Sequence, residues 1–275
     1  MIRVVRIFLF LLACVVLLNE GQLMDLYVRK GGGGTVCVEA NPCPDLESAL
    51  AVANDGATIY IGIGVWTGVE NTGQFLTGPS QGSSTSGTVE NLSLVGEGLQ
   101  PGEVTFDCNS TSRFATVTNN ALTHVSNLKI QNCHQGNAVY WVQESGGGIL
   151  IRNSSVSFTD TIFEGNRAAF GGAIAAVQSS LVLRNSAFVG NTALENGGAV
   201  NVDTTSIIVY NTSFFNNSAE ATIRYQGGGG PFENDDAGGI ESGTYNFGGR
   251  GGAVYIASNI VSAEQSFSFV DCVFV

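Results

Sequence analysis

The chain has few charged residues, and basic residues are the scarcest. Asp, Glu, Lys and Arg make up 12% of the sequence, and 11 Lys and Arg stand against 23 Asp and Glu. Nucleic-acid recognition depends on clustered Lys and Arg, so we expect no nucleic-acid partner. With only His124 and His134, and no Cys-x-x-Cys pair, the sequence also lacks a zinc-binding pattern.

The sequence has no apolar run of the roughly 20 residues that a membrane-spanning helix needs. The apolar run at residues 7–18 is shorter and follows Arg3 and Arg6, as in a signal peptide. We therefore expect residues 1–21 to be a signal peptide and the protein to be secreted or displayed at the cell surface. "LLAC", ending at Cys14, resembles a bacterial lipoprotein box, but this alternative is less favoured because the apolar run continues beyond it.

Removal of the signal peptide, which contains Cys14, leaves five cysteines, an odd number. Cys37 and Cys43 would close a short loop, and Cys108 and Cys133 would join neighbouring segments, although sequence alone does not fix the pairing. Cys272 has no obvious partner. Cysteines that form disulfides agree with an exported protein.

Glycine, in contrast, is abundant, and much of it lies in a repeated phrase. Gly-Gly-Ala-Ile/Val, or a close copy, occurs at residues 146–149, 171–174, 197–200 and 251–254, at intervals of 25, 26 and 54. A second phrase, Phe-x-x-Asn, begins at Phe163, Phe188 and Phe214 with the same spacing of 25 and 26. Two markers that advance in step indicate a structural repeat.

Between the two markers, apolar residues alternate and are followed by Asn or Asp. The pattern places Asp160, Asn185 and Asn211 at equivalent positions, and we also assign it to residues 128–133 and 267–272 and, in a weaker form, to 92–96. Alternation predicts a strand with one buried face. Because Asn and Asp tolerate left-handed backbone, we expect a corner there, with amides bonded along the stack.

Each period is thus predicted to hold three short strands that cannot bury themselves alone. Stacked coils would pair these strands in parallel, so the predicted fold is all-β: a parallel β-helix (solenoid) with coils of about 25 residues. A barrel or sandwich would show hairpin turns instead. We expect a cap region at 22–57 with a short helix in "CPDLESALAVAN", capped by Asp45, followed by the β-helix at 58–275.

An insert at about 219–249 interrupts the repeat, and inserts in solenoids often carry the binding face. Its aromatic residues are candidate contacts for a protein or glycan, or pack the insert onto the coil: Tyr225, Phe232, Tyr245 and Phe247. Its acidic residues, Glu233, Asp235, Asp236 and Glu241, offer a less favoured Ca²⁺ site. We expect no other cofactor. Because the sequence ends just after a corner, we expect it to be a truncated piece of a longer solenoid.

The paired phrases GGA(I/V) and FxxN, from about residue 90 onwards, resemble the repeats of polymorphic outer membrane proteins, within the pectin-lyase-like group. The resemblance implies a right-handed parallel β-helix with an extracellular adhesive or structural role. It brings no catalytic residues. The family's C-terminal translocator barrel is not matched here.

Related folds include polysaccharide lyases and glycoside hydrolases, which are the alternative function. Such enzymes need carboxylates paired with each other, with Ca²⁺ or with a base. The predicted corner brings Asp160 together with two asparagines, so we name no catalytic residue. Five sequons, about the number expected by chance, permit N-glycosylation: Asn91, Asn109, Asn153, Asn211 and Asn216.

Overall fold

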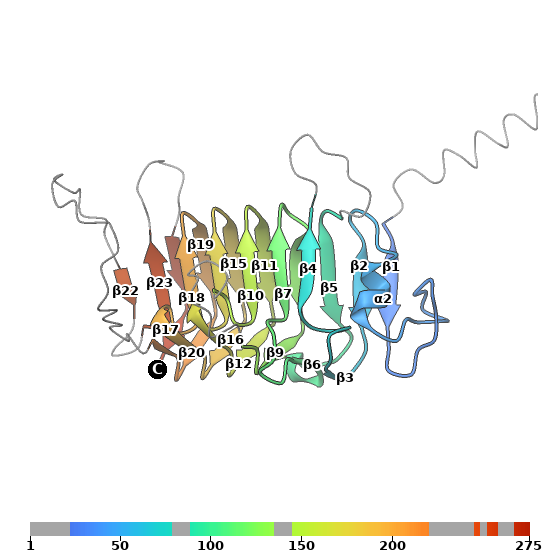
Figure 1. Cartoon of the computed structure of the whole chain (residues 1–275). Helices are drawn as coiled ribbons and strands as arrows, with labels where there is room; N and C mark the ends of the chain where they lie inside the picture. Colours follow the sequence, from blue (N-terminus) through green and yellow to red (C-terminus); the bar gives the residue numbers. More distant parts are fainter. Residues whose placement is uncertain (1–22, 79–88, 135–144, 220–244, 248–251, 258–266) are drawn as a thin grey trace, which may run out of the picture.

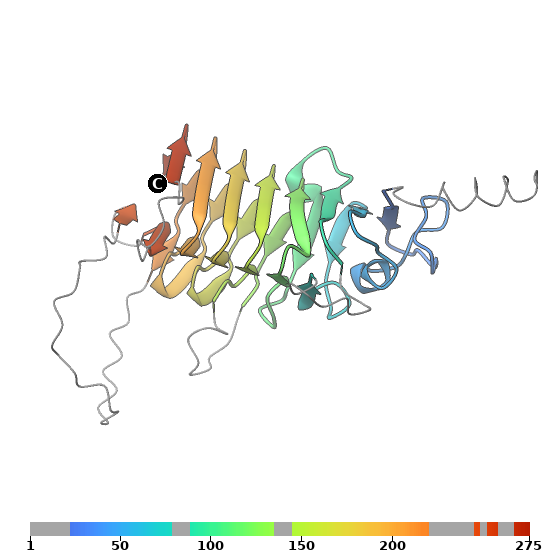
Figure 2. The ribbon, with the colours of Figure 1, turned by 90° about the horizontal axis from the view of Figure 1, so that it is seen from above.

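The computed structural model describes residues 23–78, 89–134, 145–219, 245–247, 252–257 and 267–275. The expected signal peptide lies outside these residues. The described chain is nearly all β and winds into a parallel β-helix, as the repeat predicts. Figures 1 and 2 show coil following coil along one axis, with the colours running from blue at one end to red at the other.

The strands form four sheets, and each sheet collects strands from successive coils. Sheet I contains, in spatial order, β1 (Asp25–Val28), β2 (Thr58–Ile61), β5 (Leu92–Gly96), β8 (Leu122–Ser126), β11 (Ser155–Thr159), β15 (Ser180–Arg184), β19 (Ser206–Tyr210) and β24 (Phe267–Val270). Sheet II contains β22 (Tyr245–Phe247), β23 (Val254–Ala257), β18 (Val200–Asp203), β14 (Ile174–Val177), β10 (Ile149–Arg152), β7 (Ala115–Thr118) and β4 (Gln74–Thr77).

Sheet III consists mostly of three-residue strands, and sheet IV has three strands. Sheet III contains β25 (Val273–Phe274), β20 (Ser213–Phe215), β16 (Ala187–Val189), β12 (Ile162–Glu164), β9 (Lys129–Gln131), β6 (Val104–Asp107) and β3 (Gly64–Trp66). Sheet IV contains β13 (Arg167–Phe170), β17 (Thr192–Asn196) and β21 (Ser218–Ala219). Neighbouring strands run parallel, except that β22 is antiparallel to β23.

The strand registers follow the repeat intervals. In sheet I, Ser180 pairs with Ser155 of the preceding coil and with Ser206 of the next, which are the predicted offsets of 25 and 26. In sheet II, Val200 pairs with Val254, the predicted offset of 54 across the insert. One assignment was wrong: Ile130 pairs with Phe163 in sheet III, so residues 128–133 are not equivalent to 156–161. The equivalent corner in that coil is Asn127.

The predicted corner is confirmed, because Asp160, Asn185 and Asn211 have φ of 50°, 49° and 46°. The prediction of three strands per coil was wrong. In the coil 171–196, further left-handed residues at Gln178 and Gly190, together with the one at Gly171, separate four strands. Sequence reasoning missed sheet IV because its strands β13 (RAAF), β17 (TALEN) and β21 (SA) do not alternate apolar and polar residues.

The Gly-Gly phrase is required by backbone geometry. Gly171 has φ +61°, and a Cβ there would lie 2.1 Å from the carbonyl oxygen of Ile174. A Cβ on Gly172 would lie 2.2 Å from the carbonyl oxygen of Gly198 in the next coil. Neither position has room for a side chain, so the phrase recurs wherever sheet IV turns into sheet II.

The interior is filled by columns of identical side chains. Phe163, Phe188, Phe214 and Phe274 stack with ring centroids 4.9 Å apart at each step. At the corner that follows, the Asn of Phe-x-x-Asn is buried in two copies, Asn166 and Asn191, and the amide of Asn166 bonds to Asn191 in the next coil at 3.0 Å. The core is therefore packed with side chains, and a ligand must bind outside it.

The first part of the chain contains the expected helix, α2 (Leu46–Leu50), and a 3₁₀ turn, η1 (Pro101–Glu103), follows further along. Asp45 caps α2 by accepting a hydrogen bond from the Ser48 N–H at 2.8 Å. Leu46 and Ala49 of α2 are buried in the core. The parallel pairing already includes β1, which precedes α2 in sequence.

Candidate functional site

The outer surface of sheet I is the longest continuous surface that the coils build. Alternate residues of its strands point inwards, as Leu181 and Leu183 do, and those between them point outwards. The outward residues form two rows along the rod, which we call the broad face. The first row is Asp25, Thr58, Ser93, His124, Ser157, Val182, Ile208 and Ser268, and the second is Tyr27, Tyr60, Val95, Ser126, Thr159, Arg184, Tyr210 and Val270.

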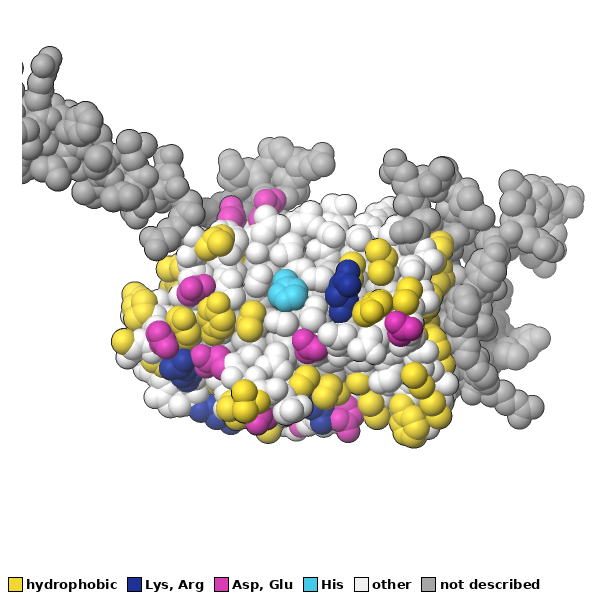
Figure 3. Space-filling model, turned by 180° about the vertical axis from the view of Figure 1, so that it is seen from behind, with side chains coloured by type: hydrophobic (Ala, Val, Ile, Leu, Met, Phe, Trp, Pro, Cys, Tyr) yellow, Lys and Arg dark blue, Asp and Glu magenta, His cyan; other side chains and the backbone are white. Residues whose placement is uncertain are grey.

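Uncharged side chains predominate on the broad face, and many of them carry a hydroxyl group. Of its residues, Asp25 and Arg184 are the ones that carry charge. Figure 3, seen from the side opposite to Figure 1, shows an even surface without a deep hollow. Its middle contains a histidine and a basic side chain among uncharged polar side chains and backbone, and hydrophobic side chains gather towards its ends.

A β-bulge and a short hydrogen-bond chain lie at the centre of the broad face. The register of β5 with β8 shifts so that Thr123 is an extra residue and Ser93 pairs with His124. His124 Nδ1 lies 2.9 Å from Ser157 Oγ, and Ser157 Oγ also lies 3.2 Å from the carbonyl oxygen of Thr123, to which it donates. Burial lowers the pKa of His124, which favours the neutral imidazole.

Aromatic residues lie towards both ends of the broad face. At the N-terminal end, the rings of Tyr27 and Tyr60 stack with centroids 5.1 Å apart. Arg29 lies 5.4 Å from the Tyr27 ring and makes two hydrogen bonds to the Glu97 carboxylate, of 2.7 and 3.0 Å. Burial and the nearby acidic groups raise the pKa of Tyr27. At the other end, Tyr210 is 42% exposed.

The insert that the sequence favoured as a binding site lies largely outside the described residues. This applies to Tyr225 and Phe232 and to the acidic residues Glu233, Asp235, Asp236 and Glu241. Tyr245 and Phe247 belong to β22, which pairs through its backbone with β23 at the edge of sheet II. The structure therefore brings none of these side chains into a described site.

The structure contains both candidate disulfides, Cys37–Cys43 and Cys108–Cys133, and Cys272 is free. The second bond joins two neighbouring coils. Cys133 occupies the place of the buried Asn in its coil, because its N–H donates to Asn166 Oδ1 at 3.0 Å. A covalent link thus replaces the asparagine ladder at that end of the same column.

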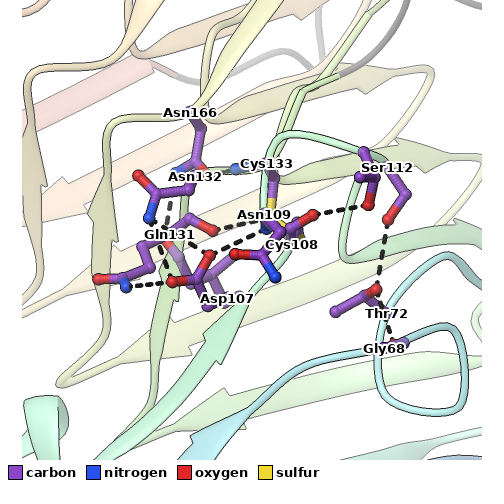
Figure 4. The surroundings of a disulfide bond; sticks show 12 residues. Gly68, Thr72, Asp107, Cys108, Asn109, Ser112, Gln131, Asn132, Cys133 and Asn166 are labelled. Atoms are coloured by element: carbon purple, nitrogen blue, oxygen red, sulfur yellow. Dashed lines mark hydrogen bonds between the residues drawn. A yellow bond between two sulfur atoms is a disulfide. The ribbon is translucent and has the colours of Figure 1, made fainter.

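Asp107 holds the chain around this disulfide (Figure 4). Its carboxylate accepts hydrogen bonds from the Asn109 N–H at 2.9 Å, from Gln131 at 2.8 Å and from Asn132 at 3.2 Å. Burial opposes ionisation of Asp107, but these hydrogen bonds and nearby Lys129 outweigh it and lower the pKa. Since its oxygens already accept these bonds, Asp107 acts as a structural anchor.

All five sequon asparagines have exposed side chains and left-handed backbone, so they lie at corners of the rod. Two of them are engaged along the stack. Asn153 donates to Asn119 Oδ1 at 2.9 Å, and Asn211 donates to Asn185 Oδ1 at 3.0 Å, as the corner prediction expected. Asn91, Asn109 and Asn216 share the same corner geometry.

Two arginines approach each other on the outer side of sheet II. Arg113 is buried and donates to Thr116 Oγ1 at 3.0 Å. Burial, together with repulsion from Arg152, lowers the pKa of Arg113 to about 10. Outward residues of sheet II such as Leu150 and Ala175 are also buried, so this side offers less accessible surface than the broad face.

Within the described ranges, no three His, Cys, Asp or Glu side chains are grouped as they would be to hold a metal ion. No described helix is both long and apolar enough to cross a membrane. Comparison of the chain with protein-family models, with curated proteins and with solved structures found no match.

Proposed function

We propose that the protein is an extracellular binding module with an adhesive or structural role, which holds a protein or glycan surface against the side of a rigid rod. The observation that carries this proposal is the broad face. It extends over successive coils at the strand spacing of about 4.8 Å, and its backbone is fixed by parallel ladders. Solenoids commonly bind through extended surfaces of this kind.

Two further observations support an extracellular setting. The two disulfides fit an oxidising compartment, because cytosolic thiols are kept reduced. The apolar run at residues 7–18 after Arg3 and Arg6 has the form of a signal peptide. The repeat phrases, which resemble those of polymorphic outer membrane proteins, add a precedent for surface display.

The test begins with expression of the full chain in a secreting host. We expect the protein to reach the medium or the cell surface with residues 1–21 removed, and the purified protein to be retained on extracellular-matrix or cell-wall preparations. Retention inside the cell with all thiols reduced would contradict the extracellular role. Release of unsaturated uronate or of reducing sugar from polysaccharides would instead favour the lyase or hydrolase alternative.

A further inference from the structure

We infer that the ligand of the broad face is an uncharged polysaccharide chain lying along the rod axis, across the strands. This inference rests on the proposed function and specifies its ligand class and its surface. Each coil presents one residue to each row, so the face offers contacts that repeat at a regular spacing. A polymer of identical sugar units is the ligand whose own repetition matches such rows.

The charge of the face argues for an uncharged polymer. The protein carries a net charge of −12, and an acidic polysaccharide would be repelled by this overall field. On the broad face, Arg184 is the one cationic side chain, which is too little to compensate. The lowered pKa of His124 keeps the centre of the face neutral as well.

The side chains of the face suit sugar hydroxyls. Ser93, Ser126 and Thr159 lie on neighbouring strands at the centre, and a hydroxyl can donate one hydrogen bond and accept others. Ser157 lies among them, but its hydroxyl already donates to the Thr123 carbonyl. Ser and Thr lose little rotamer entropy when a ligand fixes them. Surfaces built from Tyr and Ser bind well partly because these side chains lose little conformational entropy. Tyr also provides a large, rigid and amphipathic contact.

The aromatic residues at the ends add apolar contacts for the C–H faces of sugar rings. Tyr210 is 42% exposed and lies beside Ile208, which is 38% exposed, on β19. Phe215 on β20 of the same coil is similarly exposed, at 45%, but belongs to the outer side of sheet III. Tyr210 and Phe215 are therefore a matched pair of exposed aromatic residues. Comparing variants at the two positions separates binding by the broad face from non-specific hydrophobic binding.

The experiment measures retention of the purified full chain on insoluble β-1,4-glucan and chitin, with polygalacturonate as the acidic polymer and gelatin as the protein surface. We expect retention on an uncharged polysaccharide, about ten-fold weaker in Tyr210→Ala and unchanged in Phe215→Ala. Ser126→Glu, which adds charge to the broad face, should also weaken retention. Ser213→Glu, which adds it to the outer side of sheet III, should not. Circular dichroism checks that each variant is folded.

Retention on neither uncharged polysaccharide would refute the inference. Equal retention of Tyr210→Ala and Phe215→Ala would also refute it, because binding would then not use the broad face. Retention on gelatin or on polygalacturonate alone overturns the ligand class but leaves the proposed binding role standing. That role fails separately, if the unmodified protein is retained on none of the matrices.

Discussion

The buried asparagine ladder gives the sharpest prediction about stability, and Asn191→Ala tests it. The Asn191 amide makes four hydrogen bonds: it accepts from the Asn166 N–H and from Asn166 Nδ2, and it donates to the Phe163 carbonyl and to Asn217 Oδ1. The first three are buried, with lengths of 3.0 Å. Alanine removes all three bonds. Asn166 Nδ2 keeps its bond to the Ile130 carbonyl at 3.1 Å, whereas the Asn166 N–H and the Phe163 carbonyl lose these partners inside the rod.

Each buried polar group left unsatisfied costs about 1–3 kcal/mol, so the loss at two groups should lower the free energy of unfolding of Asn191→Ala by at least about 2 kcal/mol. For a chain of this size, a change of that size corresponds to a fall in melting temperature of roughly 4–8 °C. Thermal melting followed by circular dichroism measures the change. Urea unfolding provides a second measurement of the free energy.

Asn185→Gly is the matched control, because Asn185 is an exposed asparagine in the same coil. It accepts one exposed hydrogen bond from Asn211, and glycine tolerates its φ of 49°. This variant should differ from the natural protein by less than about 1 kcal/mol. If Asn191→Ala were as mild as Asn185→Gly, the ladder would not be a main source of coil cohesion and the reasoning would be refuted.

Three other predictions follow from the same geometry. Gly171→Ala should destabilise the fold strongly. Gly190 has the same φ of +61°, but no atom lies within 4 Å of an added Cβ, so Gly190→Ala should lower the free energy of unfolding by about 1–2 kcal/mol. Melting curves compare the two variants. Replacing Cys108 and Cys133 together by Ser should remove about 3 kcal/mol, measured by urea unfolding, because the bond closes a loop with a sequence separation of 25. The folded pKa of Asp107 is lowered, so its stabilisation is present above the unfolded pKa and is lost as pH falls through the folded pKa; Asp107→Asn should flatten this part of an acid-unfolding curve.

The sequence predicted the fold because the coil fixes residue types at particular places. Gly171 and Asn185 are required by left-handed backbone, and Phe188 by the stacked core, so their spacing revealed both the period and the registers. Sheet IV gave no such signal. Its strands, RAAF, TALEN and SA, do not alternate apolar and polar residues, so the sequence does not separate inward from outward positions.

The candidate site was harder to predict because outward residues obey no packing rule. Ser157 stands between Val156 and Phe158, so alternation alone already marked it as an outward residue. What alternation did not reveal is that Ser157 meets His124 of the preceding coil, because the bulge at Thr123 shifts that register. The sequence analysis placed its candidate binding residues in the insert, where the repeat is broken, and named none on the regular face.

The location of function in this rod follows from which positions the fold leaves unconstrained. Corners need left-handed residues, inward positions need apolar side chains, and outward positions of sheet II such as Ala175 are buried. Outward positions of sheets I, III and IV remain, and of these sheets sheet I has the most strands. Selection for solubility alone would fill such positions with charge. The hydroxyl and tyrosine rows of the broad face depart from that expectation, which is why we place ligand binding there.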